Sequence, residues 1–329
     1  MNINNLIDKD FSGVIRIKKC ENIILEKALG LANISYNVDN EIDTKFAIAS
    51  GGKVFVAVAI LKLIEEKKLA FDDCIGNLLD IDLKEIDPKI TIHQLLNHTS
   101  GIPDYFDESV MKDYDELWND YPNYKIRNSI DILPLFIDKP MMYPRGEKFQ
   151  YNNTGYVVLG LIIEKILNIP FDKYLEDIIF NPCNMLNTGY YELDRLPSNC
   201  ATGYIYDDER KEFYSNIYSI DVKGTGAGGV FTTISDIDKF WENLLNRKIL
   251  SDNMFSKMLS PQVDEQCYGY GIWLKKVSDD IFTPYLQGCD PGVSFLTSFD
   301  RQRNTCIILI SNFGSNVWKL HKDIISELL

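Results

Sequence analysis

The sequence predicts an α+β fold of the kind in which segments from both ends of the chain build one antiparallel sheet flanked by helices. Three observations predict it. Short apolar runs separated by turn residues, typical of strands, occur near the N-terminus and again after residue 267. A helix that is apolar on nearly every side follows the first strands, at residues 54–64. Between these parts, residues 79–261 show helical periodicity and loops, which predicts an inserted, mainly helical lobe.

The sheet is predicted from apolar runs near the two ends of the chain. Residues 11–19 alternate between apolar and polar side chains, and residues 23–29 form a second run beyond a polar turn, so we expect a hairpin. Runs at 268–277, 281–287, 293–299 and 305–313 are separated by Asp, Gly, Pro and Asn, and a last helix is predicted from Val317 to Leu329. The domain prediction is therefore residues 1–78 with 262–329 as the sheet lobe, and residues 79–261 as the helical lobe.

Two helices are predicted inside the inserted lobe. Thr91 is expected to cap a short helix in the stretch ITIHQLLNHTSGI. Residues 155–168 repeat apolar side chains at helical spacing, and Pro170 follows, where the helix is expected to have ended.

The start of the buried central helix is unusual. Ser50 stands where a helix N-cap belongs, and Lys53 follows one turn later on the same side. Gly51 and Gly52 occupy the first turn, where each costs about 1 kcal/mol relative to alanine. Two such costs side by side predict that another group approaches the backbone closely here.

Composition excludes several partners. The net charge is -14, and a nucleic acid or an anionic membrane surface would call for a basic patch instead. The longest apolar run, Val54 to Leu61, falls far short of the ~20 residues that span a membrane. We therefore expect no nucleic-acid partner and no membrane association.

The first residues lack a basic segment followed by an apolar core, so no secretory signal is predicted. Seven cysteines without a C-x-x-C pair fit free thiols in a reducing compartment, which favours a cytoplasmic location. With three histidines and no H-E-x-x-H motif, neither a histidine-based metal site nor a cofactor is expected.

Ser50 and Lys53 form an S-x-x-K pair that could carry out nucleophilic chemistry. Serine is a poor nucleophile until a neighbour takes its proton, and burial favours the neutral amine that a lysine needs to do so. The backbone N–H of Ser50 at the helix start could then bind an oxyanion. A second match, Ser109 to Lys112, lies in a polar loop with no buried helix after it and is interpreted as chance.

Further motifs follow in a fixed order along the chain. They are Leu95–Gly101 (LNHTSG preceded by Leu), Tyr151-Asn152-Asn153 after a Pro144–Glu147 turn, Gly226–Thr233, and Gly288–Gly292. The run Gly224–Gly229 fits G-x-G-x-x-G, but no βαβ unit surrounds it, so a turn packed near a cleft is favoured over a nucleotide site. His98 is interpreted as a hydrogen-bonded structural histidine, because no G-x-S-x-G elbow accompanies it.

From residue 11 to 313, this order of motifs resembles the serine β-lactamase and penicillin-binding-protein-like hydrolases, which include class C β-lactamases, D-alanyl-D-alanine carboxypeptidases and related esterases. The resemblance implies a β-lactamase/transpeptidase-like fold with its active site at the junction of the two lobes. It also implies that Ser50 is the acylated nucleophile and Lys53 its proton partner. Tyr151 would accept the serine proton and pass it to the leaving group, and Asn153 would bind the substrate's amide or ester group.

The opposite wall of the site is assigned by the same resemblance. The backbone N–H of Cys289, beside Gly288, would be the second oxyanion donor. The family usually has Lys-Thr-Gly, or His in the Lys place, where this chain has Leu286-Gln287-Gly288. A charge-assisted hydrogen bond contributes roughly 1.5 to 3 kcal/mol, so recognition of a substrate carboxylate should be weak. Arg145 and Lys148 are the cations considered as replacements.

The resulting hypothesis is a serine hydrolase that cleaves a small-molecule ester or amide through an acyl-enzyme on Ser50, with weak or no β-lactamase activity. The alternative is a catalytically silent ligand-binding or sensing protein of the same fold, which the missing cation would also suit. The sequence leaves the oligomeric state open.

Overall fold

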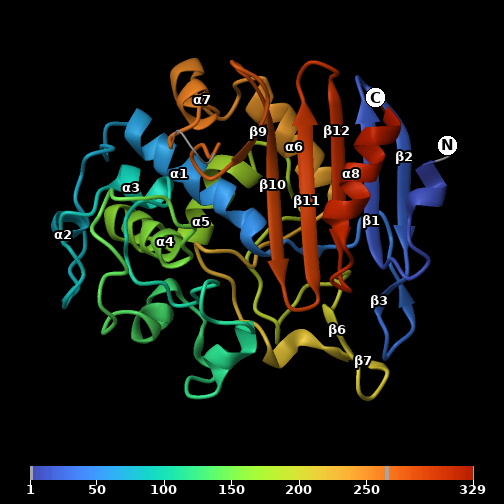
Figure 1. Ribbon diagram of the computed structural model, residues 1–329, viewed down its shortest axis with the longest axis horizontal. Helices are drawn as coiled ribbons and strands as arrows, with labels where there is room; N and C mark the ends of the chain where they lie inside the picture. Colours follow the sequence, from blue (N-terminus) through green and yellow to red (C-terminus); the bar gives the residue numbers. More distant parts are fainter. Residues whose placement is uncertain (1–2, 264–266, 329) are drawn as a thin grey trace.

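A computed structural model describes residues 3–263 and 267–328 and shows a six-stranded antiparallel sheet in the order β2-β1-β12-β11-β10-β9. Strands from the two ends of the chain meet at the pair β1–β12, whose register runs from Gly13 opposite Ser311 to Lys19 opposite Thr305. Figure 1 shows the blue N-terminal strands beside the red C-terminal ones. The predicted α+β fold and terminal sheet are confirmed. The strands are β1 (Gly13–Lys19), β2 (Asn22–Leu29), β9 (Trp273–Ser278), β10 (Ile281–Asp290), β11 (Val293–Asp300) and β12 (Thr305–Ser311).

Helices cover both faces of this sheet. The amphipathic helix α8 (Val317–Leu328) packs on β11 and β12 over one face, and its predicted last residue, Leu329, lies outside the described residues. The other face packs against the central helix α1 (Lys53–Glu65) and against α6 (Ile234–Leu245). Because α6 falls within residues 79–261 yet packs on β1 and β12, part of the inserted segment belongs to the sheet's own packing.

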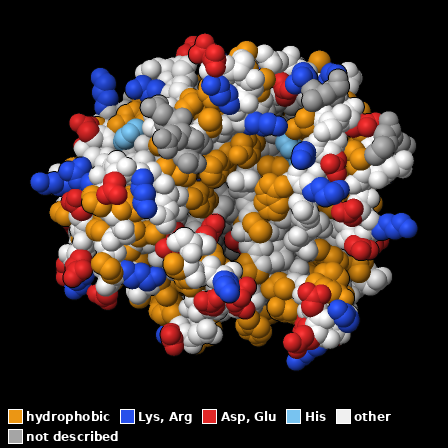
Figure 2. Space-filling model, in the orientation of Figure 1, with side chains coloured by type: hydrophobic (Ala, Val, Ile, Leu, Met, Phe, Trp, Pro, Cys, Tyr) orange, Lys and Arg blue, Asp and Glu red, His pale blue; other side chains and the backbone are white. Residues whose placement is uncertain are grey.

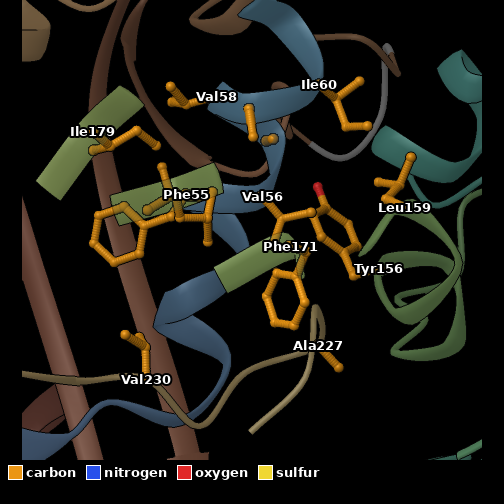
Figure 3. Close-up of a cluster of buried hydrophobic side chains, with 14 of the residues drawn as sticks. Phe55, Val56, Val58, Ile60, Tyr156, Leu159, Phe171, Ile179, Ala227 and Val230 are labelled. Atoms are coloured by element: carbon orange, nitrogen blue, oxygen red, sulfur yellow. The ribbon is translucent and has the colours of Figure 1, made fainter. Parts of the chain in front are cut away.

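Helix α1 is buried all round, as predicted. Every residue from Val54 to Leu61 is at most 1% exposed. Around it lie α4 (Thr154–Leu167), α5 (Phe171–Leu175) and the following helical turn Glu176–Phe180, and Figure 3 shows side chains from these elements packed together. Phe55 meets the rings of Phe180 and Phe240 edge to face at 5.1 and 4.9 Å. One continuous hydrophobic core therefore joins the sheet to the helical segment.

The start of α1 differs from the prediction in one respect. Ser50 does not cap the helix but lies inside a 3₁₀ turn, Ala49–Gly52, that leads into it. The glycine pair does mark a close approach: a Cβ on Gly51 would lie 2.5 Å from the ring of Phe295, and one on Gly52 would lie 3.1 Å from the Tyr190 hydroxyl. The approaching groups belong to this chain itself, so the glycines are needed for packing.

The remaining elements are short. Thr91 caps α3 with the predicted hydrogen bond from the Gln94 backbone N–H, in a complete capping box. Helix α4 ends at Asn168 in the left-handed conformation, two residues before Pro170. The other helices and strands are α2 (Ile75–Leu78), α3 (Ile92–Leu96), α7 (Asp252–Met258), β3 (Leu31–Asn33), β4 (Val38–Asp39), β5 (Phe46–Ala47), β6 (Tyr204–Asp207), β7 (Glu212–Ser215) and β8 (Phe231–Thr232), with 3₁₀ turns at Ile3–Leu6, Tyr114–Trp118, Asn123–Lys125, Ser129–Leu135 and Asn216–Tyr218.

Within residues 3–263 and 267–328, no single helix has the length and apolar character needed to cross a membrane. In this described part of the chain, one pair of helices taken together meets both criteria: Thr154–Leu167 and Phe171–Phe180, which are bent by 80° at their junction. All seven cysteines are free thiols.

The central helix generates a stability prediction. Replacing Phe55, which is fully buried between two other rings, with alanine should lower the free energy of unfolding by about 3 to 5 kcal/mol. Urea denaturation followed by circular dichroism measures this. Tyr218→Ala is the control, because Tyr218 is 78% exposed and its loss should change stability by less than about 0.5 kcal/mol. A loss below about 1 kcal/mol at Phe55 would contradict the central role of this helix.

Candidate active site

The nucleophile turn lies against an open edge of the sheet. Strand β9 pairs with β10 only as far as Tyr285, so from residue 286 onward this edge of β10 has no described strand beside it, and the turn Ala49–Gly52 packs there instead. The approach is very close at Gly288: a Cβ there would lie 2.2 Å from the Ile48 carbonyl oxygen and 2.9 Å from the Ser50 backbone nitrogen. Only glycine allows the β10 backbone to reach the backbone of Ser50 in this way.

Lys53 is buried beneath Ser50. Its Nζ lies 2.9 Å from Ser50 Oγ and 2.8 Å from Asn153 Oδ1, and it also contacts the carbonyl oxygen of Ala227. Burial lowers the pKa of Lys53 to about 8, although the carboxylates of Asp104 and other acidic residues act in the opposite direction. The amine is thus neutral in a substantial fraction of molecules just above neutral pH, as a proton acceptor must be.

Tyr151 completes the group. Lys53 Nζ lies 5.0 Å from the centre of its ring, and Ser50 is close enough to its phenol to act against the rise in its pKa. The ring stacks against Trp273, with 5.9 Å between centroids. Burial holds the pKa of Tyr151 well above its ordinary value of 10, so the phenol carries its proton at neutral pH. Ser50, Lys53, Tyr151 and Asn153, predicted together from separate motifs, therefore lie together.

A buried carboxylate, which the sequence analysis missed, holds the Tyr151–Asn153 segment in place. Asp104 accepts hydrogen bonds from the backbone N–H of Asn153 at 2.8 Å and of Thr154 at 3.0 Å, and from the Thr154 hydroxyl at 3.1 Å. It is 4% exposed, and burial raises its pKa to about 6. Asp104 thereby satisfies the free backbone donors at the start of α4 and fixes Asn153 against Lys53. The only signal in the sequence is its place three residues after the LNHTSG motif.

His98 supports the same segment from the other side. Its Nδ1 accepts a hydrogen bond from the Asn152 backbone N–H at 3.1 Å, and its ring lies 4.5 Å from that of Tyr151. Burial holds the pKa of His98 well below its ordinary value, with Lys53 adding to the effect. The imidazole is therefore neutral and carries its proton on Nε2. The interpretation of His98 as a hydrogen-bonded structural residue is confirmed.

The glycine run 224–229 packs against the nucleophile turn, as the sequence analysis favoured. A Cβ on Gly228 would lie 2.6 Å from the Ala49 carbonyl oxygen, and the neighbouring Ala227 supplies the carbonyl that contacts Lys53.

Two predicted binding residues are wrongly assigned. Gln287 lies on the opposite face of the sheet, where its Oε1 accepts a hydrogen bond from Trp318 Nε1 of α8 at 2.8 Å. Leu286 is 3% exposed and packs in the main core instead of lining the cavity. Side chains of a strand alternate between its two faces, so Gln287 faces α8 and Leu286 faces the other way. On that other face Leu286 is covered by the hydrophobic core and does not reach the cavity. Of the four predicted wall residues, Cys289 is the one that lines the cavity.

Neither Arg145 nor Lys148 replaces the cation that the family usually has at the position of Leu286. Arg145 pairs with Asp87, with Nε 2.9 Å from Oδ2, and Lys148 lies over the ring of Tyr143 at 4.9 Å. Neither residue lines the cavity that contains Ser50.

A cavity of about 440 Å³ opens in front of Ser50 and Asn153. Figure 2 shows the surface hollowed between the helical part and the sheet, with hydrophobic and acidic side chains around the hollow. Its acidic lining, which the sequence analysis missed because the residues are far apart in the chain, consists of Glu108, Asp113, Asp221 and Asp290. The cavity is large enough for a small organic molecule and places it beside the serine hydroxyl.

Comparison with known proteins agrees with this geometry. The beta-lactamase family model matches residues 10–327. The putative penicillin-binding protein PbpX of Bacillus subtilis is 27% identical over 314 residues, which cover 95% of this chain and 73% of PbpX. The crystal structure of a penicillin-binding protein from Bacillus halodurans has 37% identity, a TM-score of 0.93 and 99% coverage of both chains.

The chain therefore belongs to the beta-lactamase family. Its fold is also that of the D-amino acid amidase of Ochrobactrum anthropi SV3, which is 20% identical, with a TM-score of 0.81 over 99% of this chain and 98% of the amidase. The predicted resemblance and the β-lactamase/transpeptidase-like fold are both confirmed.

The buried carboxylate generates a prediction about positioning. Asp104→Asn replaces one acceptor oxygen with an NH₂ group that faces a backbone N–H, so Asn153 should shift from Lys53 and kcat for ester turnover should fall by about tenfold or more. KM should change less than kcat, because Asp104 lies behind the site. Steady-state kinetics on a nitrophenyl ester measure both constants.

Asp208→Asn serves as the matched control, because Asp208 is 90% exposed. Circular dichroism establishes that each variant is folded. An Asp104→Asn protein that is folded and keeps the wild-type kcat would rule out this positioning role.

Proposed function

We propose that this protein is a serine hydrolase that cleaves a small ester or amide through an acyl-enzyme on Ser50, in the manner of an esterase or peptidase, with weak or no β-lactamase activity. The observation that carries the proposal is the 2.9 Å contact between Ser50 Oγ and the buried Nζ of Lys53. The names of similar proteins support an amide-cleaving or penicillin-binding chemistry at this site. Seven free cysteines support the proposal of a cytoplasmic location.

The proton steps follow from the pKa values. Neutral Lys53 takes the proton of Ser50 as Oγ attacks the substrate carbonyl carbon. This differs from the expectation that Tyr151 accepts that proton, because burial keeps the phenol of Tyr151 protonated. The resulting oxyanion is bound by the backbone N–H groups of Ser50 and Cys289, which the close approach at Gly288 brings near each other.

Collapse of the tetrahedral intermediate breaks the bond to the leaving group. Tyr151 donates its proton to that leaving atom and regains one from the Lys53 ammonium, so the acyl-enzyme forms with the charges restored. A water molecule then attacks the acyl carbon while neutral Lys53 takes one of its protons. Collapse of this second intermediate releases the acid as Tyr151 donates its proton to Ser50 Oγ and regains one from the Lys53 ammonium.

The rival proposal is a silent binding or sensing protein, favoured by the buried Leu286 where the family has a cation. Such a protein has no need of a lysine amine with a lowered pKa in contact with a serine hydroxyl. That contact is why we prefer the enzyme.

Turnover by wild type and Ser50→Ala tests the proposal. With a short-chain nitrophenyl ester, Ser50→Ala should lose at least about a thousandfold in kcat/KM, and only the wild type should gain a fluorophosphonate adduct by mass spectrometry. A chromogenic cephalosporin should be cleaved slowly or not at all. Equal ester turnover by both proteins sinks the acyl-enzyme proposal, and a wild type with neither turnover nor adduct is the silent protein.

The pH profile tests the assignment of Lys53 as the base. Its neutral form, which accepts the proton, becomes the major form as pH rises through about 8, so kcat/KM for a neutral ester should climb between pH 6 and 9. Lys53→Arg should abolish turnover across this range, because guanidinium does not deprotonate. Lys165→Arg, on the exposed side of α4, is the control for the change of cation. A flat profile over this range would exclude Lys53 as the base.

A further inference from the structure

We infer that the cavity in front of Ser50 selects substrates that carry a positively charged ammonium group. The inference rests on the proposed function, since it names the class of ester or amide that the same site would accept. It is drawn from the carboxylates of the cavity, from how few cations lie near them among the described residues, and from the aromatic rings beside them.

Carboxylates from three separate segments converge on the cavity. Asp290 ends strand β10, two residues after Gly288, while Asp221 follows the 3₁₀ turn Asn216–Tyr218 and Glu108 lies in the loop after Asp104. Asp221 accepts a hydrogen bond from the Tyr114 hydroxyl at 3.0 Å. The side chain of Asp290 has no hydrogen-bond donor among the residues that the structure describes, although it lines the cavity together with Ser50.

The acidic groups of the cavity have few cationic neighbours among the described residues. Burial and the neighbouring Asp221 raise the pKa of Asp290 to about 8, and burial raises that of Asp221 to about 6. Lys53 is already bonded to Ser50, Asn153 and Ala227, so it has no further donor to offer. Lys112 lines the cavity too, but it is exposed, and solvent weakens the attraction between its charge and the carboxylates of the cavity.

Aromatic rings give a second, independent indication of a cationic ligand. Tyr105, Phe106 and Tyr114 line the cavity beside the carboxylates. The hydroxyls of Tyr105 and Tyr114 are 3.3 Å apart, and the rings of Phe106 and Tyr114 meet edge to face at 4.8 Å, so these side chains form one fixed wall. Ring faces attract alkylammonium groups, and the attraction grows where water is excluded.

The residues at the end of β10 also favour an ammonium ligand. The place that would hold a lysine or histidine in the family is taken by Leu286, which is buried in the core, and Asp290 follows four residues later. An ammonium group in the cavity would thus meet Asp290 and Asp221 without a facing cation to repel it. A substrate carboxylate would meet like charges instead.

Three nitrophenyl esters of matched length test the inference. They are the esters of 4-(trimethylammonio)butyrate, of its neutral isostere 5,5-dimethylhexanoate, and of glutarate, whose free end is a carboxylate. We expect kcat/KM to be about tenfold or more higher for the cationic ester than for the neutral one, and lowest for the glutarate ester. The trimethylammonium charge does not titrate, so its ratio to the neutral ester should grow between pH 6 and 9 as Asp290 loses its proton.

Substitutions of Asp290 and Asp221 test whether these two residues cause the preference for the cationic ester. Asp290→Asn and Asp221→Asn should each reduce the cationic-to-neutral ratio of kcat/KM several-fold, whereas Asp279→Asn, in the exposed turn before β10, should retain it. Because the measure is a ratio within one protein, a partial loss of folded enzyme does not affect it.

The outcomes separate this inference from the function on which it rests. Three results overturn the inference and leave the hydrolase proposal standing, provided that turnover depends on Ser50. They are a cationic-to-neutral ratio of kcat/KM near one, a preference for the neutral or anionic ester, and a cationic preference that both aspartate variants keep. Absence of Ser50-dependent turnover on all three esters overturns the hydrolase proposal itself.

Discussion

The site depends on one desolvated amine. Lys53 is the first residue of a helix buried on every side, and its Nζ is held between Ser50, Asn153 and a backbone carbonyl. Burial is the largest influence on its pKa and lowers it toward neutral pH. A helix with one solvent-facing side would let water reach the ammonium and restore its ordinary pKa. The apolar run of α1 from Val54 to Leu61, which keeps water from the amine, is therefore what makes the lysine a base.

The backbone around that amine is held with little freedom. Gly288 lets β10 touch the nucleophile turn, Gly228 lets the glycine run do the same from another side, and Asp104 ties the start of α4 to the loop after α3. Each contact joins segments far apart in the chain. Reacting groups must be placed to within a fraction of an ångström. The close backbone contacts at the glycines and the buried hydrogen bonds of Asp104 provide that precision.

The sequence predicts those features of the site that depend on residues close together in the chain. Ser50 with Lys53 is a short motif on a strongly apolar helix, and Tyr151 with Asn153 directly precedes another. The ordered resemblance to the family joined these two motifs into one predicted site. Gln287 was misassigned because its neighbours in the motif do not reveal which face of β10 it occupies, and a shift of one residue reverses the face. Asp104 and Asp290 were missed because their surroundings come from segments far away in the chain, Asn153 and Thr154 for Asp104 and Asp221 for Asp290, which no local pattern records.

The same electrostatics link the base to the cavity. Asp104 and Asp290 both act to raise the pKa of Lys53, and Lys53 in turn lowers those of Asp104 and Asp290. A lysine in the place of Leu286 would neutralise Asp290 and, as a like charge, disfavour the ammonium form of Lys53. With leucine there, the carboxylates keep the pKa of Lys53 near 8 instead of lower. The leucine at position 286 and the acidic cavity thus act on one balance. A bound ammonium group would neutralise Asp290 and favour the neutral, proton-accepting form of Lys53.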